Sequence, residues 1–564
     1  MLRKPITRRL SAVLCLALAS FAQTLVAADH YATPQGAGTM DGTSWADALP
    51  QAGIETTLNA MPAGDTLYLG SGSYTLASLQ ITSSGTAGSP KALIGVDTGS
   101  GLPVFQGTFD VHNAAGSTFL LFPDAASHWE LKNLRFRNQP FAITLRRNET
   151  TDTLRTNLTF ENLHFDSVED AIRLYNASDI LVKDCTVVRY TKKAFRIGDY
   201  TSFVVFDTCF ADCNEGDPTF PSRSIPNGFA LDDTDGEPTI HDITFQDCVA
   251  MNNGFAQGSS VYWNGDGFSS ERGAYNITFL RCKSYNNMDG GFDNKASYIT
   301  YQDCVASGNL RGFRHWADNG VMFNCVSTNN SANGGTGSPY GIWVSGSGGV
   351  LNIDFSTVHN GVPGIAIENG GVVTVSNSIL STTSATAAFA SVSATLIDTA
   401  TYRPGQGTDP QYVLLNPNWQ GTPVDAMDSQ TYGTTKGYHS SRVDETPNVA
   451  PTLTIAASIT SGVAPVQVAF TATANDPDGT VISYLWDFGD GQVSNEPNPS
   501  HTYDVPGEFL VTCNITDNRG ARVGESLSIT VSVPTVPQAM RIESGNTTSY
   551  TDVNGQSWAP DHSY

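Results

Sequence analysis

Short apolar runs alternate with polar turn residues along most of this chain, and several of the runs share one pattern. In these segments apolar and polar residues alternate up to a terminal cysteine: residues 180–185, 243–248, 277–282, 299–304 and 321–325. Such alternation is typical of β-strands with one buried face. The cysteines that end the last four of these segments are spaced by 34, 22 and 21 residues. A repeat in the low twenties with a strand in each repeat predicts a solenoid of stacked turns.

A second strand recurs in the same repeats, and it begins with a small residue followed by a large apolar one. Its members are residues 171–175, 194–198, 228–232, 267–271, 291–295, 312–316, 341–345 and 364–368. Because side chains alternate between the faces of a strand, the apolar residue should point inward and the third and fifth residues outward. Successive turns stack about 4.8 Å apart. The outward residues should therefore form one wall, which favours a binding groove: Arg173, Tyr175, Arg196, Asp232, Glu271, Asp293, Lys295, Arg314, Trp316 and Trp343.

The two strands together predict an all-β fold in which residues 29–445 form a right-handed parallel β-helix. In this fold the repeated cysteines point inward and stack as a ladder of free thiols. A disulfide between Cys209 and Cys213 stays an alternative. The entry segment before the repeats resembles the N-terminal turns of bacterial β-helix proteins, and on that resemblance Trp45 and Asp65 have structural roles.

The first 28 residues have the features of an export signal. Four basic residues precede an apolar run over residues 10–21, and Val26, Ala27 and Ala28 provide small residues for cleavage before Asp29. This order of charged, apolar and small residues is typical of secretory signal peptides. No later segment is apolar enough to span a bilayer. We therefore expect a secreted, extracellular protein with no membrane partner.

The charge of the chain narrows the choice of partners. The sequence has 54 acidic and 30 basic residues, which gives a formal net charge of −24. Such a charge disfavours nonspecific binding to nucleic acid or to an anionic membrane. A polyanionic ligand would need a bridging cation or a local cluster of Arg and Lys side chains.

Two regions follow the repeats. Residues 446–534 contain motifs that resemble those of the PKD domain, a β-sandwich: Asp476-Pro-Asp-Gly479, Tyr484-Leu-Trp-Asp-Phe-Gly-Asp-Gly491, His501-Thr-Tyr503 and Asp517-Asn-Arg-Gly520. On this resemblance Trp486 and Tyr503 belong to its core. Residues 535–564 resemble the start of a malectin-like carbohydrate-binding domain. We expect this part to be an incomplete domain, because one hairpin is too short to form a core.

Three turns of the second strand series resemble those of a known enzyme family. They read Asp266-Gly-Phe268, Asp289-Gly-Gly-Phe-Asp293 and Gly312-Phe-Arg314. The region is therefore similar to the family-nine polysaccharide lyases, which include pectate lyases and have Asp-Gly-Phe, Asp-Asp-Gly-Trp-Asp and Gly-Phe-Lys turns. In that family the aspartates hold Ca²⁺ and the lysine removes a proton. The resemblance implies a polysaccharide lyase that cleaves a uronate-containing, pectate-like polymer by Ca²⁺-assisted β-elimination, and we expect it to act as a monomer.

The resemblance implies that Asp266, Asp289 and Asp293 bind the Ca²⁺ cofactor. Gly290 stands where the family has a further aspartate, so one carboxylate is missing. We expect Asp232 to supply a further ligand; Asp233, Asp235 and Glu271 are alternatives. Ca²⁺ prefers several oxygen ligands, and it acidifies the proton next to a carboxylate that it binds.

Arg314 stands at the place of the family's lysine, and we predict that it is the base. Lys295 lies one turn away on the same face and is its rival. A cationic side chain accepts a proton only if neighbouring positive charge or burial lowers its pKa. The residues expected to bind substrate are Glu271, Arg311, His315, Trp316 and Trp343. Strand alternation, however, predicts that His315 points inward, which favours a hydrogen-bonded core histidine, and the two tryptophans equally fit an exposed rim.

Two other functions stay open. A glycoside hydrolase needs a pair of carboxylates, and Asp232 with Asp233 offers one that faintly resembles the pair of β-helix polygalacturonases. A non-catalytic protein that binds glycans at the cell surface would explain the departures at Gly290 and Arg314.

Overall fold

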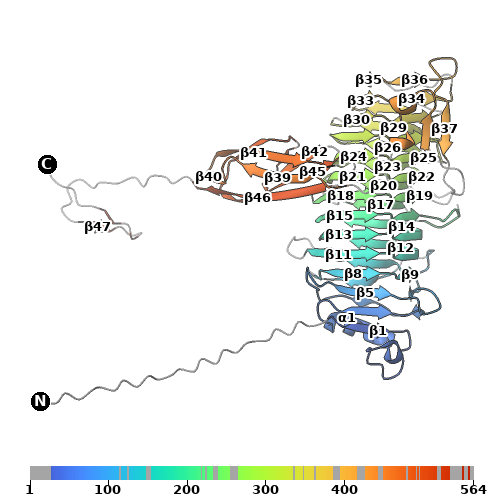
Figure 1. The fold of residues 1–564 in the computed structure, drawn as a ribbon, viewed down its shortest axis with the longest axis vertical. Coiled ribbons are helices and arrows are strands. Elements are labelled where there is room, and N and C mark those ends of the chain that lie inside the picture. The colour runs from blue at the N-terminus through green and yellow to red at the C-terminus, as the bar shows by residue number, and fades with distance from the viewer. Residues whose placement is uncertain are drawn as a thin grey trace, which may run out of the picture.

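The computed structural model shows a long coil of parallel β-strands with a separate β-sandwich beside it (Figure 1). It describes residues 27–533 and parts of 549–558, with gaps at 113–115, 124–125, 148–153, 218, 223–224, 233–238, 255–263, 334–336, 347, 361–363, 385–393, 416–425, 443–448, 478–480, 491, 495 and 518–521. The predicted export signal lies outside the described residues, apart from its last two positions. Most of the malectin-like stretch also lies outside them, and its described part includes the short strands β47 (Tyr550–Thr551) and β48 (Ser557–Trp558).

Each turn of the coil contributes strands to three faces, which we call sheets I, II and III in chain order. Sheet I is a continuous parallel sheet of fourteen strands. Its strands are β1 (Asp29–Ala32), β2 (Thr66–Leu69), β5 (Lys91–Gly95), β8 (Trp129–Lys132), β11 (Arg155–Glu161), β13 (Ala177–Lys183), β15 (Thr201–Asp207), β18 (Ile240–Gln246), β21 (Tyr275–Leu280), β24 (Ser297–Gln302), β27 (Gly320–Phe323), β30 (Val350–Asp354), β33 (Val372–Ser376) and β35 (Thr395–Ile397).

Sheets II and III are joined through two long strands, β12 (His164–Leu174) and β14 (Thr186–Gly198), which run across both faces. Sheet II also has β3 (Ser73–Tyr74), β6 (Val104–Gln106), β9 (Arg135–Arg137), β16 (Phe210–Asp212), β19 (Val249–Met251), β22 (Lys283–Tyr285), β25 (Val305–Ser307), β28 (Val326–Thr328), β31 (Thr357–Asn360), β34 (Ile379–Thr382) and β36 (Ala400–Tyr402). Sheet III also has β4 (Leu79–Gln80), β7 (Thr118–Phe122), β10 (Phe141–Leu145), β17 (Asn227–Asp232), β20 (Asp266–Ser270), β23 (Gly290–Asn294), β26 (Arg311–His315), β29 (Tyr340–Ser345) and β32 (Ile365–Glu368).

Equivalent side chains stack inside the coil, as the repeats predict. Phe229, Phe268, Phe292 and Phe313 form a column with ring centroids 4.8–4.9 Å apart. The repeated cysteines are buried free thiols, which confirms the inward ladder: Cys185, Cys209, Cys248, Cys282, Cys304 and Cys325. Cys213 is also buried and free, so the disulfide left open between it and Cys209 is not formed. Column stacking fixes the register of each turn against the next.

Each end of the coil has a segment that departs from the repeat. At the N-terminal end lie the 3₁₀ turns at Trp45–Asp47 and Gln51–Gly53 and the helix α1 (Ile54–Ala60). The Asp65 carboxylate lies 3.1 Å from the His30 ring nitrogen Nε2, which agrees with a structural role. In the described part of the chain, no helix is long and apolar enough to cross a membrane.

At the other end, the last coil strand is β36, and the following residues turn back. The strands β37 (Tyr412–Leu415) and β38 (Ala426–Ser429) form an antiparallel hairpin, followed by the 3₁₀ turns Gly433–Thr435 and Ser440–Arg442. Met427 and Tyr438 pack against sheet II side chains. The predicted β-helix region to residue 445 thus ends in a return segment rather than in further turns.

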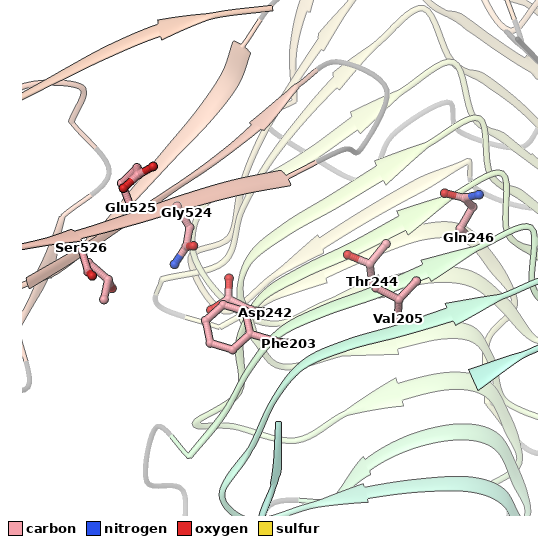
Figure 2. A pocket seen from close by; sticks show the side chains of 10 residues that line it. Phe203, Val205, Asp242, Thr244, Gln246, Gly524, Glu525 and Ser526 are labelled. Carbon is pink, nitrogen blue, oxygen red and sulfur yellow. The ribbon is translucent and has the colours of Figure 1, made fainter. Parts of the chain in front are cut away.

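The β-sandwich follows this return segment. One sheet has β39 (Thr452–Ala457), β41 (Val466–Asn475) and β44 (Ser500–Tyr503); the other has β40 (Ser461–Val463), β42 (Val481–Asp487), β43 (Val493–Ser494), β45 (Gly507–Asp517) and β46 (Arg522–Ser532). Trp486 and Tyr503 are buried in its core, as predicted. The strands β45 and β46 face β15 and β18 of sheet I across a cavity of about 590 Å³ (Figure 2).

Candidate functional site

A bend at the start of each sheet III strand decides which side chains reach the outer face. A Cβ atom placed on Gly267 would lie 2.0 Å from the Ser284 hydroxyl oxygen, which is buried. The glycine and the following Phe268 therefore both face the interior, and strict alternation fails at this point. As a result the residue before the glycine turns outward, which adds a row that the alternation rule omits. Lys193, Asn227 and Asp266 are in register in this row.

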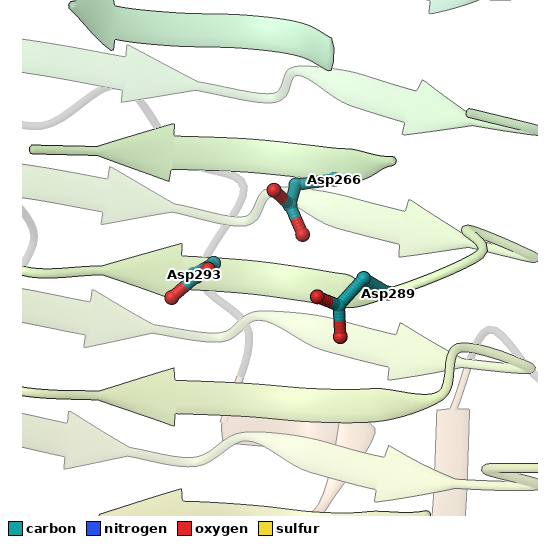
Figure 3. Close-up of side chains that lie close together, drawn as sticks. All are labelled: Asp266, Asp289 and Asp293. Atoms are coloured by element: carbon teal, nitrogen blue, oxygen red, sulfur yellow. The ribbon is translucent and has the colours of Figure 1, made fainter. Parts of the chain in front are cut away.

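Three aspartates meet on this face, and we call them the aspartate triad: Asp266, Asp289 and Asp293 (Figure 3). Asp266 opens β20, Asp289 directly precedes β23, and Asp293 lies within β23. One carboxylate oxygen from each lies within 4.8 Å of the others. The backbone N–H of Gly290 donates to Asp266 at 2.7 Å. The sequence-based grouping of these three residues is thus reproduced by the tertiary structure.

Two arginines and a tryptophan contact the triad from the next turn. The Arg314 Nη1 atom donates to Asp289 at 2.9 Å and to Asp293 at 2.8 Å. Arg311 donates to the other oxygen of Asp289 at 2.6 Å, and the Trp316 ring N–H donates to Asp293 at 2.8 Å. Two guanidinium groups thus lie directly against the carboxylates of the triad.

Burial raises the pKa values of two aspartates of the triad. Burial, together with the negative charges of Asp293 and Asp289, raises the pKa of Asp266 well above its usual range. Burial also raises the pKa of Asp289, although Arg314 and Arg311 oppose this change. Crowded carboxylates with raised pKa values are typical of sites where a cation or a substrate supplies the missing positive charge.

The triad fits the oxygen spacing of a calcium site. Ca²⁺ binds oxygen at about 2.3–2.6 Å, so two oxygens on one ion lie at most about 5 Å apart. The 4.8 Å limit within the triad satisfies this condition. A Cβ atom on Gly290 would lie 2.9 Å from an Asp266 oxygen and 3.0 Å from the Asp293 Cβ. The residue that the family has as a fourth aspartate would therefore join the same cluster, and this chain lacks that ligand.

Asp232 does not join the triad. Its carboxylate lies 3.2 Å from Nε of Arg196, and it is not among the three carboxylates whose oxygens lie within 4.8 Å of one another. Asp232 as a further Ca²⁺ ligand therefore stays a prediction. Asp233 and Asp235 lie outside the described residues. Glu271 is likewise engaged, since both of its carboxylate oxygens lie 2.7 Å from Lys295 Nζ.

His315 and the tryptophans have different surroundings. His315 is fully buried, and burial lowers its pKa to about 4. Its inclusion in the substrate-binding set does not fit this position, because the strand alternation points its ring into the coil. The guanidinium groups of Arg311 and Arg314 lie 4.9 and 4.8 Å from the Trp343 ring centroid. Trp316 meets Trp343 edge to face at 4.6 Å.

Two functional candidates escaped the sequence analysis, Lys193 and Asn227. Lys193 is 5% exposed, and its Nζ donates to the Asn227 side-chain oxygen at 2.7 Å. The Asn227 amide in turn donates to Asp266 at 3.2 Å. Both residues directly precede the small residue of their repeat. Asp266 occupies the same position in its own repeat. This shared position was the sequence signal that could have identified Lys193 and Asn227.

Two adjoining concavities lie along sheet III. The central groove has a volume of about 340 Å³ and includes Lys193, Asn227, Asp266, Asp293 and Lys295 in its lining. The arginine pocket, about 730 Å³, lies toward the N-terminal turns and is lined by Arg146, Arg147, Arg173, Arg196, Tyr175 and Asp232, among others. Arg196 and Asp232 line both. The face thus offers acidic and basic surfaces in succession, in a place separate from the cavity beside the sandwich.

Comparison with known proteins agrees with this architecture. Residues 119–293 match the family model described as right handed beta helix region, and residues 448–533 match the PKD domain. The predicted right-handed parallel β-helix and the PKD domain are therefore confirmed. Neither match extends over half of the chain.

Curated relatives match either part of the chain. A pectate lyase, PEL9 of Emericella nidulans, is 33% identical over 129 residues, which cover 22% of this chain and 31% of that protein. The collagenase ColQ1 of Bacillus cereus is 35% identical over 95 residues, which cover 17% of this chain and 10% of the collagenase. The solved structure of pectate lyase Pel9A is 15% identical, with a TM-score of 0.40, and covers 68% of this chain and 82% of Pel9A. The chain thus spans less than a third of the curated relatives it matches.

Proposed function

We propose that this protein is a secreted polysaccharide lyase that cleaves a uronate-containing polymer by β-elimination, with Ca²⁺ held by Asp266, Asp289 and Asp293. The observation that carries the proposal is the aspartate triad, two of whose members line a groove that cationic side chains also line. The similarity to a pectate lyase over 129 residues supports the same class of reaction.

The chemistry requires three things of the site. Ca²⁺, when bound, would bridge the acidic protein to a uronate carboxylate and make the proton on the adjacent carbon more acidic. A base must take this proton, and the glycosidic oxygen must gain one as its bond to carbon breaks. The protein must also hold an anionic chain against its own net charge of −24.

The surroundings of Arg314 and Lys295 bear on the choice of base. Arg314 contacts two carboxylates, and Lys295 contacts both oxygens of Glu271. Both side chains are thus engaged in ion pairs. We therefore assign Arg314 chiefly to binding the substrate carboxylate, and we retain its role as base as the alternative. Lys295, which pairs with the Glu271 carboxylate, has a binding role.

The arginine pocket supports an acidic substrate. Four arginines line it on a chain with a large negative charge. Arg173 is packed against Phe141 at 4.4 Å, which fixes its guanidinium, and it lies 3.5 Å from the buried Asp170. Because the pocket adjoins the central groove, it is placed to bind the carboxylates of sugars that flank the cleaved bond.

The test is a product assay on a panel of uronate polymers, with and without a chelator. A lyase gives products with an unsaturated, ultraviolet-absorbing end, and removal of Ca²⁺ abolishes them. New reducing ends without absorbance would identify a hydrolase. Binding without any cleavage would identify a glycan-binding protein, and either result would overturn the proposal. Undiminished cleavage in excess chelator would remove the metal from it.

A further inference from the structure

Lys193 stands in a different environment from the other cations of this face. Within the described part of the chain, its Nζ forms no ion pair, and its hydrogen-bond partner is the neutral side-chain oxygen of Asn227 at 2.7 Å. Arg314 and Lys295 each contact carboxylates. Lys193 therefore differs from Arg196 and Lys295, which also line the central groove and each form an ion pair with a carboxylate.

The fold holds Lys193 close to the triad. Lys193, Asn227 and Asp266 occupy successive register positions on β14, β17 and β20. The amide of Asn227 links the other two, because it accepts from Lys193 and donates to Asp266 at 3.2 Å. Lys193, Asp266 and Asp293 line the same groove. A sugar ring that occupies this groove would contact both the lysine and the carboxylates.

The charges around Lys193 come from four strands. Burial lowers its pKa, and Arg196 on its own strand adds to this effect. Asp232 on β17, Asp170 on β12 and Asp266 on β20 oppose it, and the lowering prevails. A buried lysine with a lowered pKa holds a larger neutral fraction near neutral pH, which is the form that accepts a proton.

We propose that Lys193 is the base of the elimination, positioned by Asn227, and that Arg314 is not. This inference rests on the proposed lyase function. Lys193 Nζ takes the proton from the carbon next to the uronate carboxylate. The electrons of that C–H bond form a carbon–carbon double bond, and the bond from the next carbon to the glycosidic oxygen breaks. The oxygen leaves with a proton from water, and the lysine later returns its own proton to water, so the protein is unchanged.

The experiment compares Lys193→Met with wild type on polygalacturonate, or on whichever polymer of the panel wild type cleaves. We expect kcat to fall by about 10²–10⁴, the usual contribution of general base catalysis, while KM changes little. Calorimetry should find an unchanged Ca²⁺ affinity, and circular dichroism an unchanged fold. The matched control is Lys183→Met, which removes a lysine on sheet I that pairs with Asp207 and should leave both constants unchanged.

Two further readouts separate a base from a structural lysine. Lys193→Arg keeps the charge, and its residual activity should rise only at more alkaline pH than in wild type, because arginine loses a proton less readily. A small primary amine added to Lys193→Ala should restore part of the turnover.

Retained kcat in Lys193→Met, with wild type forming the unsaturated product, would overturn this inference and leave the lyase function intact. Loss of Ca²⁺ affinity without rescue by amine would also overturn it. A wild-type protein that forms no unsaturated product would refute the proposed function itself.

Discussion

Arg314 contacts two of the proposed Ca²⁺ ligands, and this contact predicts how its removal changes the affinity for Ca²⁺. Arg314→Gln should bind Ca²⁺ more tightly than wild type. The guanidinium donates to Asp289 and Asp293 at 2.9 and 2.8 Å, so it competes for oxygens that the ion would use. It also repels the ion directly.

The size of the effect follows from Coulomb's law. Two unit charges 4 Å apart interact by about 1 kcal/mol in water and about 4 kcal/mol near a protein surface. A divalent ion doubles these values, which gives about 2 kcal/mol as the lower limit. This corresponds to roughly a 30-fold lower dissociation constant. Turnover should nevertheless fall, because the substrate carboxylate loses its partner.

The assay is isothermal titration of Ca²⁺ into the wild type and Arg314→Gln at low ionic strength, with turnover measured in parallel. Arg281→Gln serves as the control. Arg281 forms an ion pair with Asp247 at 2.6 Å and does not contact the triad. An equal gain in Ca²⁺ affinity in both variants would show that the effect comes only from the change in net charge. Weaker Ca²⁺ binding by Arg314→Gln, with the fold intact, would refute the reasoning and show that the arginine orders the ligands.

Three other outcomes are expected. Asp293→Ala should abolish Ca²⁺ binding and turnover without changing the circular dichroism spectrum; persistence of either would place the cation elsewhere. Burial lowers the pKa of His315 to about 4 in the folded protein, whereas an exposed histidine in the unfolded chain has a pKa of about 6.5. The folded state is therefore fully stable with respect to this group above about pH 6.5, and it loses stability as the pH falls toward 4, because the unfolded chain binds the proton first. Between pH 7 and 5 the free energy of unfolding should therefore drop by about 2 kcal/mol more in wild type than in His315→Gln, as measured by denaturant titration; equal slopes would contradict it, and exposed His112→Gln is the control. Arg173→Gln should raise KM for long uronate polymers and spare the shortest cleavable oligomer; an equal loss on both would show that the arginine pocket is not a separate subsite.

Much of the fold could be predicted from the sequence because β-helix turns repeat. Alternation with period two identified the strands, and the cysteine spacing identified the turn length. Each side chain inside the coil stacks on its equivalent, so the inward positions of Cys248, Cys282, Cys304 and Cys325 followed from sequence spacing alone. The grouping of Asp266, Asp289 and Asp293 came from the family resemblance, and the structure brings their carboxylates together on one face.

The tertiary structure alone decided which groups on that face are free to react. The bend at the small residues Ala194 and Gly228 turns Lys193 and Asn227 outward, and strict alternation along a strand does not predict this. Ion pairs between turns hold Asp232 on Arg196 and Lys295 on Glu271, and they depend on side-chain reach across the sheet rather than on spacing in the chain. The sequence by itself determined the row of each side chain, because stacking is periodic. Charge state depends on the distances and burial of each side chain, and these exist only in the folded coil.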